Sequence, residues 1–221
     1  SIISIRLIAL LKASGFNITV RDLFVNKTVA KLALINKKMI FEKEYQPFSL
    51  IDEEDKLRII TEHNIPLDAI TDIYPAAYLQ MGMIIEAKRS TVTEGIYHDV
   101  FAYNVHYTFD YKKFINCWKI LIKYHEQLRV RFIEESIGYL NCIYRTIDLG
   151  SKFSMIDKSE DIVAFITKEK GNELDLSSPG VFRLFVQIQD DNNFTLIFSF
   201  HHAITDGWSV ASLISKFIDL Y

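Results

Sequence analysis

Apolar side chains near the amino terminus recur at helical spacing. Residues 2–11 place an apolar stripe along a helix, and Gly15 is suited to ending it. Thr19 followed by Asp22 forms a variant of the capping box, and Thr28 is placed to begin another short helix. The start of the chain is therefore predicted to be a module of short helices joined by short turns.

This regular spacing weakens from about residue 35 to residue 72. Acidic residues accumulate there, and Pro47 and Pro66 interrupt regular structure, so we expect a linker over residues 37–72. The segment also carries apolar side chains that we expect to lie along the surface of a neighbouring domain: Phe41, Tyr45, Phe48, Leu50 and Ile51.

Beyond residue 74 the pattern predicts strands as well as helices. Alternating apolar and polar side chains over residues 101–109 are typical of a half-buried strand. Turn-forming residues at 190–193 separate two apolar runs, 182–188 and 194–200, which predicts an antiparallel hairpin. Further strands are expected at 128–133 and 139–147, and helices after Asp110, over 161–167 and over 210–218.

Composition excludes several classes of protein. Of the 221 residues, 49% are apolar and 13% aromatic, so the chain can bury a core and is not disordered. The 25 basic and 28 acidic side chains leave no cationic excess for a nucleic acid and no polybasic cluster for a membrane surface. The apolar run at residues 7–11 is too short to span a bilayer. We expect neither a nucleic-acid nor a membrane partner.

The two cysteines, Cys117 and Cys142, lie within otherwise regular apolar patterns. This placement suits buried thiols better than a disulfide framework, so we expect a reducing, cytoplasmic setting.

The first residue is not Met, which suggests that the chain is a fragment.

Residues 198–209, FSFHHAITDGWS, are the strongest candidate for chemistry. Neighbouring side chains on a strand point to opposite faces, so His201 and His202 cannot share one role, and one of them should face an open site. The ordinary pKa of histidine suits proton exchange near neutrality, and Asp206 could orient a loop or a ring. Gly207 would let the backbone turn sharply or let a ligand approach closely.

Two plainer interpretations of this segment are open. Both histidines could be structural residues at the mouth of a hairpin. A metal site is the other, but the Asp206-Gly207 turn argues against the continuous helix that would align His and Asp as ligands, so we expect no metal.

Three segments resemble motifs of the condensation domains of nonribosomal peptide synthetases. HHAITDGWS is similar to the family's HHxxxDG signature. KYHEQLRVRF at residues 123–132 resembles RHExLRTxF, with departures at Tyr124 and Val130. YPAAYLQMGM at residues 74–83 resembles YPLSPLQxGM. Because the three segments keep the family's order and approximate spacing, they favour a functional role for the histidine pair.

The amino-terminal helical module resembles another part of the same machinery. SIISIRL, followed by a glycine turn, DLF and a short Thr-headed helix, is similar to the carrier-protein half that begins at the serine bearing 4'-phosphopantetheine. The resemblance implies that Ser1 is the attachment residue, although the Gly-Gly-Asp expected before it is absent. A helix-capping role for Ser1 is the alternative, and the two roles are compatible.

The resemblance implies a multi-domain chain. Residues 1–36 would be part of a small all-α carrier-protein helical bundle, 37–72 a linker, and 73–221 the amino-terminal lobe of a condensation domain. That lobe is expected to have an α/β, chloramphenicol-acetyltransferase-like fold with a mixed, largely antiparallel sheet. The family's active site lies between two lobes, so without the second lobe the chain alone would be catalytically incomplete.

The implied reaction is attack by the α-amino group of an acceptor aminoacyl thioester on a donor acyl or peptidyl thioester. The resemblance assigns the site to His201, His202, Asp206 and Gly207, with His202 facing the substrates. It also suggests that a salt bridge from Asp206 to Arg129 holds the loop. Residue identity leaves open whether His202 removes a proton, stabilises the tetrahedral intermediate or positions the amine.

Two other functions remain open. A stand-alone HxxxD acyltransferase would use coenzyme A and lack a carrier segment, whereas a non-catalytic member would only recruit carrier-bound partners. The leading hypothesis implies carrier domains with their thioesters, and an adenylation domain of the same assembly line, as partners. Donor stereochemistry and the peptide product are left open.

Overall fold

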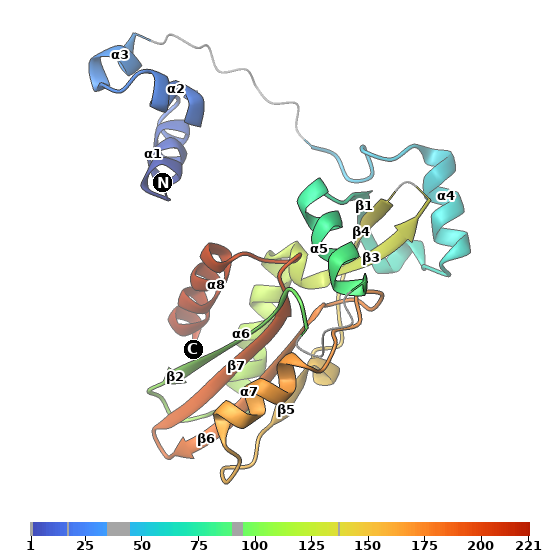
Figure 1. The fold of residues 1–221 in the computed structure, drawn as a ribbon, viewed down its shortest axis with the longest axis vertical. Coiled ribbons are helices and arrows are strands. Elements are labelled where there is room, and N and C mark those ends of the chain that lie inside the picture. The colour runs from blue at the N-terminus through green and yellow to red at the C-terminus, as the bar shows by residue number, and fades with distance from the viewer. Residues whose placement is uncertain (1, 17, 35–44, 90–94, 137) are drawn as a thin grey trace. The chain divides into compact units, whose positions relative to one another are not determined.

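The computed structural model describes five stretches of the chain: residues 2–16, 18–34, 45–89, 95–136 and 138–221. The chain divides into two compact units, Ser1–Gln46 and Pro47–Tyr221. Figure 1 shows the helices and strands of both units.

The first unit consists of short helices, as the sequence predicts. They are α1 (Ile2–Ala13), α2 (Val20–Val25) and α3 (Val29–Ala33). Thr19 and Asp22 form the expected capping box of α2, and the side chain of Thr28 caps α3 by accepting a hydrogen bond from the Lys31 backbone. Ser1 lies outside the described residues.

The second unit combines helices with two sheets. Its helices are α4 (Glu53–Glu62), α5 (Tyr78–Arg89), α6 (Tyr111–Tyr124), α7 (Ile162–Lys170) and α8 (Gly207–Leu220). Its strands are β1 (Ile70–Pro75), β2 (His98–Val105), β3 (Val130–Glu135), β4 (Gly138–Tyr144), β5 (Phe153–Met155), β6 (Phe182–Asp190) and β7 (Asn193–His201).

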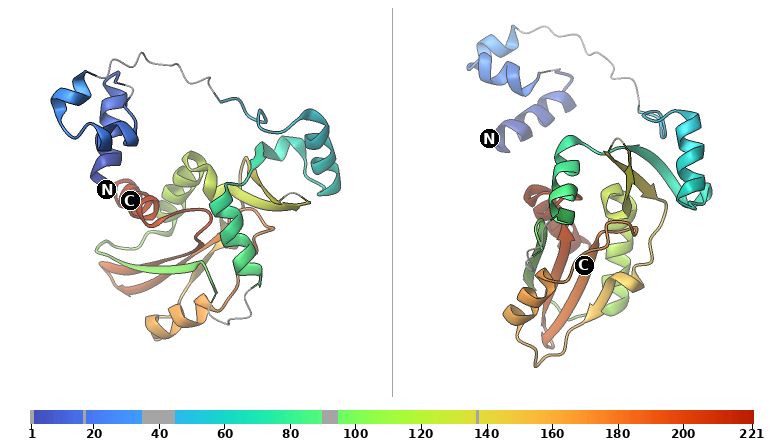
Figure 2. Two further views of the ribbon diagram at one scale, coloured as in Figure 1. Left: turned by 45° about the horizontal axis from the view of Figure 1, so that its top comes forward. Right: turned by 45° about the vertical axis from the view of Figure 1, so that its right-hand side comes forward.

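The larger sheet has the order β2-β7-β6-β5, in which only the β5–β6 pairing is parallel. The expected hairpin is confirmed as β6 and β7. Helix α7 covers one face of the sheet, while α6 and α8 cover the other (Figures 1 and 2). This is the mixed, largely antiparallel α/β arrangement that the family resemblance implies, although the strands form two sheets and not one.

Strand β7 shows why the sheet is covered on both faces. Alternate side chains pack against Phe114 and Trp118 of α6 and Phe217 of α8: Phe194, Leu196, Phe198 and Phe200. The intervening Ile197 packs with α7 on the opposite face. Since both faces are buried, β7 is a continuous apolar run rather than an alternating one.

The smaller sheet, of order β1-β4-β3, holds much of the segment expected to be a linker. Helix α4 buries Ile59 against this sheet, and Phe48 and Ile51 pack beside it. Arg58 and His63 of the α4 region contact Glu135 of β3 at 3.0 and 3.3 Å. The expected linker over residues 37–72 is therefore wrong from residue 47 onward, while residues 37–44 lie outside the described part.

Both cysteines are free and buried, as predicted. Burial raises the pKa of the Cys142 thiol to about 12, so this side chain is an inert part of the core. Within the described part of the chain, the helices are too short or too polar to cross a membrane.

Candidate active site

His201 and His202 lie at the end of β7 and leave the large sheet on opposite faces. His201 pairs with His98 of β2 and shares the α7 face with Ile197. The backbone N–H of His202 donates to the carbonyl of Tyr97 at 2.7 Å, so pairing with the β2 side continues past the end of the strand. The two rings therefore meet different surroundings.

The ring of His202 is partly open to solvent. Its side chain is 31% exposed, and its Nδ1 lies 2.9 Å from Oδ2 of Asp99 in β2. The other ring nitrogen, Nε2, makes no hydrogen bond to any described residue. One nitrogen is thus fixed by the protein and the other is free for a substrate.

The ring of His201 is enclosed. His201 is only 3% exposed, its Nδ1 accepts a hydrogen bond from the Ala203 backbone at 3.1 Å, and its buried Nε2 has no partner among the described groups. Burial, followed by the charges of His98 and His202, lowers the pKa of His201 to about 4. At neutral pH His201 is therefore an uncharged structural residue.

A buried polar network underlies the same end of the sheet. Ser199 of β7 donates to Oε1 of Glu169 at 2.7 Å, and its hydroxyl lies 2.7 Å from Nε2 of His98. Arg183 of β6 donates to the same oxygen of Glu169 at 2.6 Å. The network connects Glu169 of α7 with Arg183, Ser199 and His98 of the large sheet. It thereby holds α7 against the face of the sheet on which His201 lies.

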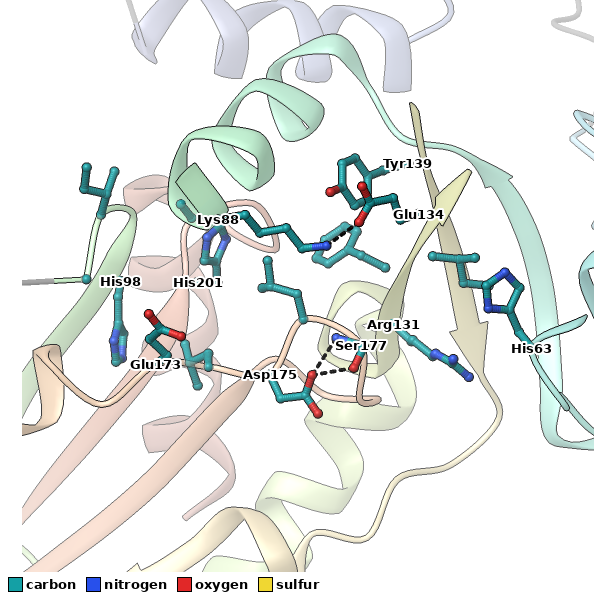
Figure 3. A pocket seen from close by; sticks show the side chains of 17 residues that line it. His63, Lys88, His98, Arg131, Glu134, Tyr139, Glu173, Asp175, Ser177 and His201 are labelled. Atoms are coloured by element: carbon teal, nitrogen blue, oxygen red, sulfur yellow. Dashed lines mark hydrogen bonds and ion pairs between the residues drawn. The ribbon is translucent and has the colours of Figure 1, made fainter. Parts of the chain in front are cut away.

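A cavity of about 730 Å³ opens beside His98 and His201, between α5, β3 and the loop around Asp175. Figure 3 shows the lining side chains, including the ion pair between Lys88 and Glu134 at 2.6 Å. His202 is not among the residues that line this cavity. The cavity and the open nitrogen of His202 are separate features of the fold.

The buried neutral His201 predicts a pH dependence of stability. Its folded pKa of about 4 lies below the ordinary 6.5, so the unfolded chain binds the proton more readily. Stability is complete above about pH 6.5 and is lost as the pH falls toward 4, by on the order of 3 kcal/mol. Urea denaturation between pH 7 and pH 4 should show a shallower loss for His201→Gln than for wild type, and equal slopes would contradict this assignment.

Asp206 is a helix cap in this structure. Its Oδ1 accepts a hydrogen bond from the Ser209 backbone at 2.7 Å at the start of α8. That backbone contact holds the pKa of the Asp206 carboxyl below its usual range. Asp206 itself is exposed. Its role is to start the helix that follows the histidine loop.

Arg129 is buried and does not pair with Asp206, so the expected salt bridge is wrong. Its Nε donates to the carbonyl of Ile122 at 2.9 Å, which caps the last turn of α6. Its terminal nitrogens donate to the carbonyls of Lys123, Tyr144 and Arg145. The guanidinium is satisfied by backbone at the junction of α6 and β4, and it supports the fold there rather than the loop.

This correction predicts independent effects in a double-mutant cycle. Arg129→Met should destabilise the chain by about 1–3 kcal/mol, because buried carbonyls lose their donors. Asp206→Ala should cost about 1 kcal/mol through the lost cap, and Asp206→Asn less, since asparagine also caps helices. The two effects should add to within about 0.5 kcal/mol in urea denaturation. A larger coupling energy would show that Asp206 and Arg129 interact, and would contradict this correction.

Gly207 does not serve the expected sharp turn. It is the first residue of α8, its φ lies outside the left-handed region, and an added Cβ would meet no atom within 4 Å. Nothing in the described chain therefore requires glycine at this position.

The structure brings the first and third resembling segments together through Gln80 of α5. Its Nε2 donates to the carbonyl of Ala203, directly after the histidine pair, at 3.0 Å. Its Oε1 accepts hydrogen bonds from Ala77 at 3.0 Å and from Asn141 of β4 at 3.2 Å. Gln80 thus fixes the backbone of the histidine loop from the side of the smaller sheet.

Sequence reasoning missed one residue of this site, Asp99, and one contact, the hydrogen bond from Gln80 to the Ala203 carbonyl. Asp99 carries no motif, and its partnership follows only from the pairing of β2 with β7. Gln80 lies in the segment at residues 74–83 that resembles a family motif, but the sequence around it does not indicate that its side chain bonds to Ala203. Both are long-range contacts, which spacing along the chain does not reveal.

The chain matches the family described as Condensation domain over residues 70–221. AMB antimetabolite synthetase AmbE of Pseudomonas aeruginosa is 25% identical over 239 residues, covering 99% of this chain and 11% of that protein. Bacitracin synthase 1 of Bacillus licheniformis is 26% identical over 213 residues, covering 88% of this chain and 4% of that protein. The chain spans only a small part of the length of these relatives.

Solved structures show the same fold. The four-domain nonribosomal peptide synthetase holo-AB3403 matches with a TM-score of 0.59 and 18% identity, over 68% of this chain and 12% of that one. The first condensation domain of the CDA synthetase matches with a TM-score of 0.57 and 15% identity, over 67% of this chain and 39% of that one. Over residues 70–221 the chain belongs to the condensation-domain family, the amide-bond-forming acyltransferase domains of nonribosomal peptide synthetases.

Proposed function

We propose that this chain takes part in peptide-bond formation between a donor acyl or peptidyl thioester and an acceptor aminoacyl thioester. The observation that carries the proposal is the partly exposed ring of His202, whose Nε2 has no hydrogen-bond partner among the described residues, in a condensation-domain sequence. His202 is the residue that contacts the reacting groups, and His201 is its buried structural neighbour.

Amide formation requires one proton acceptor near the attacking amine. The amine nitrogen bonds to the thioester carbonyl carbon, the carbon–sulfur bond breaks, the amine loses a proton and the leaving thiolate gains one. Nε2 of His202 can accept that proton or hold the amine through a hydrogen bond. Holding both thioesters in place can contribute roughly 7–11 kcal/mol when the geometry is favourable.

Residues 1–36 are proposed to be part of a carrier domain whose Ser1 bears 4'-phosphopantetheine. Two observations support this: α1 to α3 belong to a unit of their own, and the alignment with AmbE covers 99% of the chain, beyond the condensation-domain match. Ser1 lies outside the described residues, so its assignment rests on the sequence resemblance.

Treatment of the full-length protein with a phosphopantetheinyl transferase and coenzyme A is expected to add one phosphopantetheine group at Ser1. Intact-mass measurement followed by peptide mapping would locate it. The Ser1→Ala variant should lose that gain while α2 and α3, which are capped by their own threonines, stay folded. A wild-type protein without modification at Ser1 would remove the carrier assignment.

The proposed function implies that other domains of the assembly line act as partners of this chain. Donor and acceptor carrier domains would deliver the thioesters, and an adenylation domain of the same assembly line would load them. The two free, buried thiols suit a reducing, cytoplasmic setting.

The test is reconstitution with the full-length protein and carriers preloaded with donor and acceptor. Mass spectrometry of the acceptor carrier should reveal the amide product. If amide formed only from coenzyme A thioesters, the chain would be a stand-alone acyltransferase. If no amide formed from loaded carriers that bind the protein, it would be a non-catalytic recruiting member.

A further inference from the structure

We infer that Asp99 is the positioning residue that holds His202 in the tautomer required of a proton acceptor. The inference rests on the proposed function of His202 and names a residue outside the HHAITDGWS segment. The tautomer determines which ring nitrogen of His202 carries the proton. The inference therefore favours the role of proton acceptor among those that residue identity leaves open for His202.

The register of β2 and β7 places Asp99 beside His202. The backbone of His202 is bonded to the carbonyl of Tyr97, and Asp99 lies two residues farther along the same strand edge. Residues two apart on a strand share a face, and diagonal cross-strand neighbours are within reach of long side chains. Asp99 pairs with Phe200, whose ring belongs to the face covered by α6 and α8.

The contact itself fixes the proton. Nδ1 of His202 lies 2.9 Å from Oδ2 of Asp99, and an ionised carboxylate can only accept hydrogen bonds. Nδ1 must therefore carry the hydrogen, which leaves the lone pair of the neutral ring on Nε2. That nitrogen lies on the other side of the ring and has no partner in the described chain.

The side chain of Asp99 has one hydrogen-bond partner among the described residues, the ring of His202. This side chain is 37% exposed. Asp206, the acidic residue of the motif, is engaged as the cap of α8. Asp99 is thus the carboxylate available to orient the imidazole, in the way that an aspartate orients the histidine of a hydrolytic triad.

The first experiment measures the tautomer directly in the 221-residue chain labelled with ¹⁵N-histidine. In wild type, the His202 shifts should report a protonated Nδ1 and an unprotonated Nε2 at a pH where the ring is neutral. Asp99→Asn keeps the side-chain shape but can donate to Nδ1, so it should populate the tautomer with the hydrogen on Nε2. The exposed Asp219→Asn of α8 is the control for charge and should leave the shifts unchanged.

The second experiment measures amide formation in the full-length protein with preloaded carriers. Asp99→Asn should lower kcat by roughly 10–100-fold with an unchanged KM for the acceptor carrier, since the wrong tautomer presents a donor to the amine. Asp99→Glu, which restores a carboxylate, should recover part of the loss. Asp219→Asn should match wild type.

The outcomes separate this inference from the proposed function. A wild-type ring protonated on Nε2, or a tautomer unaffected by Asp99→Asn, would overturn the positioning role. Full activity of Asp99→Asn alongside an inactive His202→Ala would overturn it too, and would leave the proposed function intact. The expected tautomers together with full activity of His202→Ala would instead overturn the proposed function.

Discussion

Replacing His202 by alanine is expected to slow amide formation by roughly 10²–10⁴-fold, the range for losing a positioned proton-transfer group. The fold should survive, because the side chain is 31% exposed and its hydrogen bond goes to the partly exposed Asp99. Exposed ion pairs contribute little to stability, so the free energy of unfolding should change by less than about 1 kcal/mol. Product formation and thermal denaturation measure the two effects.

His106→Ala is the matched control for this variant. His106 is an exposed histidine directly after β2, and its Nδ1 lies 2.7 Å from Oδ1 of Asn193 at the start of β7. It should retain the wild-type rate. If both variants were equally slow, the loss would come from the removal of any histidine near this sheet and not from the reacting ring.

Replacing Glu169 by alanine is expected to lower the free energy of unfolding by about 3–5 kcal/mol. Glu169 is buried and accepts hydrogen bonds from Arg183 and Ser199. Its removal leaves the guanidinium of Arg183 without its charged partner and the buried His98–Ser199 pair without its acceptor. Urea denaturation measures the loss.

Two further variants show whether the buried position is responsible. Glu169→Gln keeps the side-chain oxygen and should lose less stability than the alanine variant. Glu173→Ala removes a nearby exposed carboxylate and should change stability by less than about 0.5 kcal/mol. Equal losses at positions 169 and 173 would show that the network does not stabilise the end of β7.

Local signals predicted the elements whose ends are set by neighbours in sequence. The predicted caps at Thr19, Thr28 and Asp110 begin helices in the structure, each with its side chain accepting a backbone hydrogen bond. The helix expected over 161–167 is also present, but Asp161 is its cap and not its first residue. Such caps act within one turn of a helix, so the residues that carry them are sufficient to locate them.

Segments whose order comes from distant contacts were harder to predict. The sequence predicts a linker where α4 lies, because Pro47 and Pro66 stand at either side of it, yet Asp52 caps the helix and Ile59 is buried against the smaller sheet. Helix α5 has Ile84 as its fully buried residue and leaves Tyr78 exposed, so its amphipathic pattern is weak.

The same distinction holds for the site. The sequence located His202 and implied that its ring and that of His201 face different surroundings. It could not supply Asp99, whose approach depends on strand register, and the resemblance led to an ion pair between Asp206 and Arg129 that the structure replaces with two separate caps.

The most direct test of the central claim isolates the chemical step. Both carriers of the full-length protein are preloaded, the donor and acceptor are mixed, and amide formation is followed in a single turnover by quenched flow. The account predicts that His202→Ala leaves carrier loading and binding unchanged but slows the amide-forming step at least 100-fold, within the range of general acid–base contributions. Single-turnover amide formation at the wild-type rate without the His202 imidazole would contradict it.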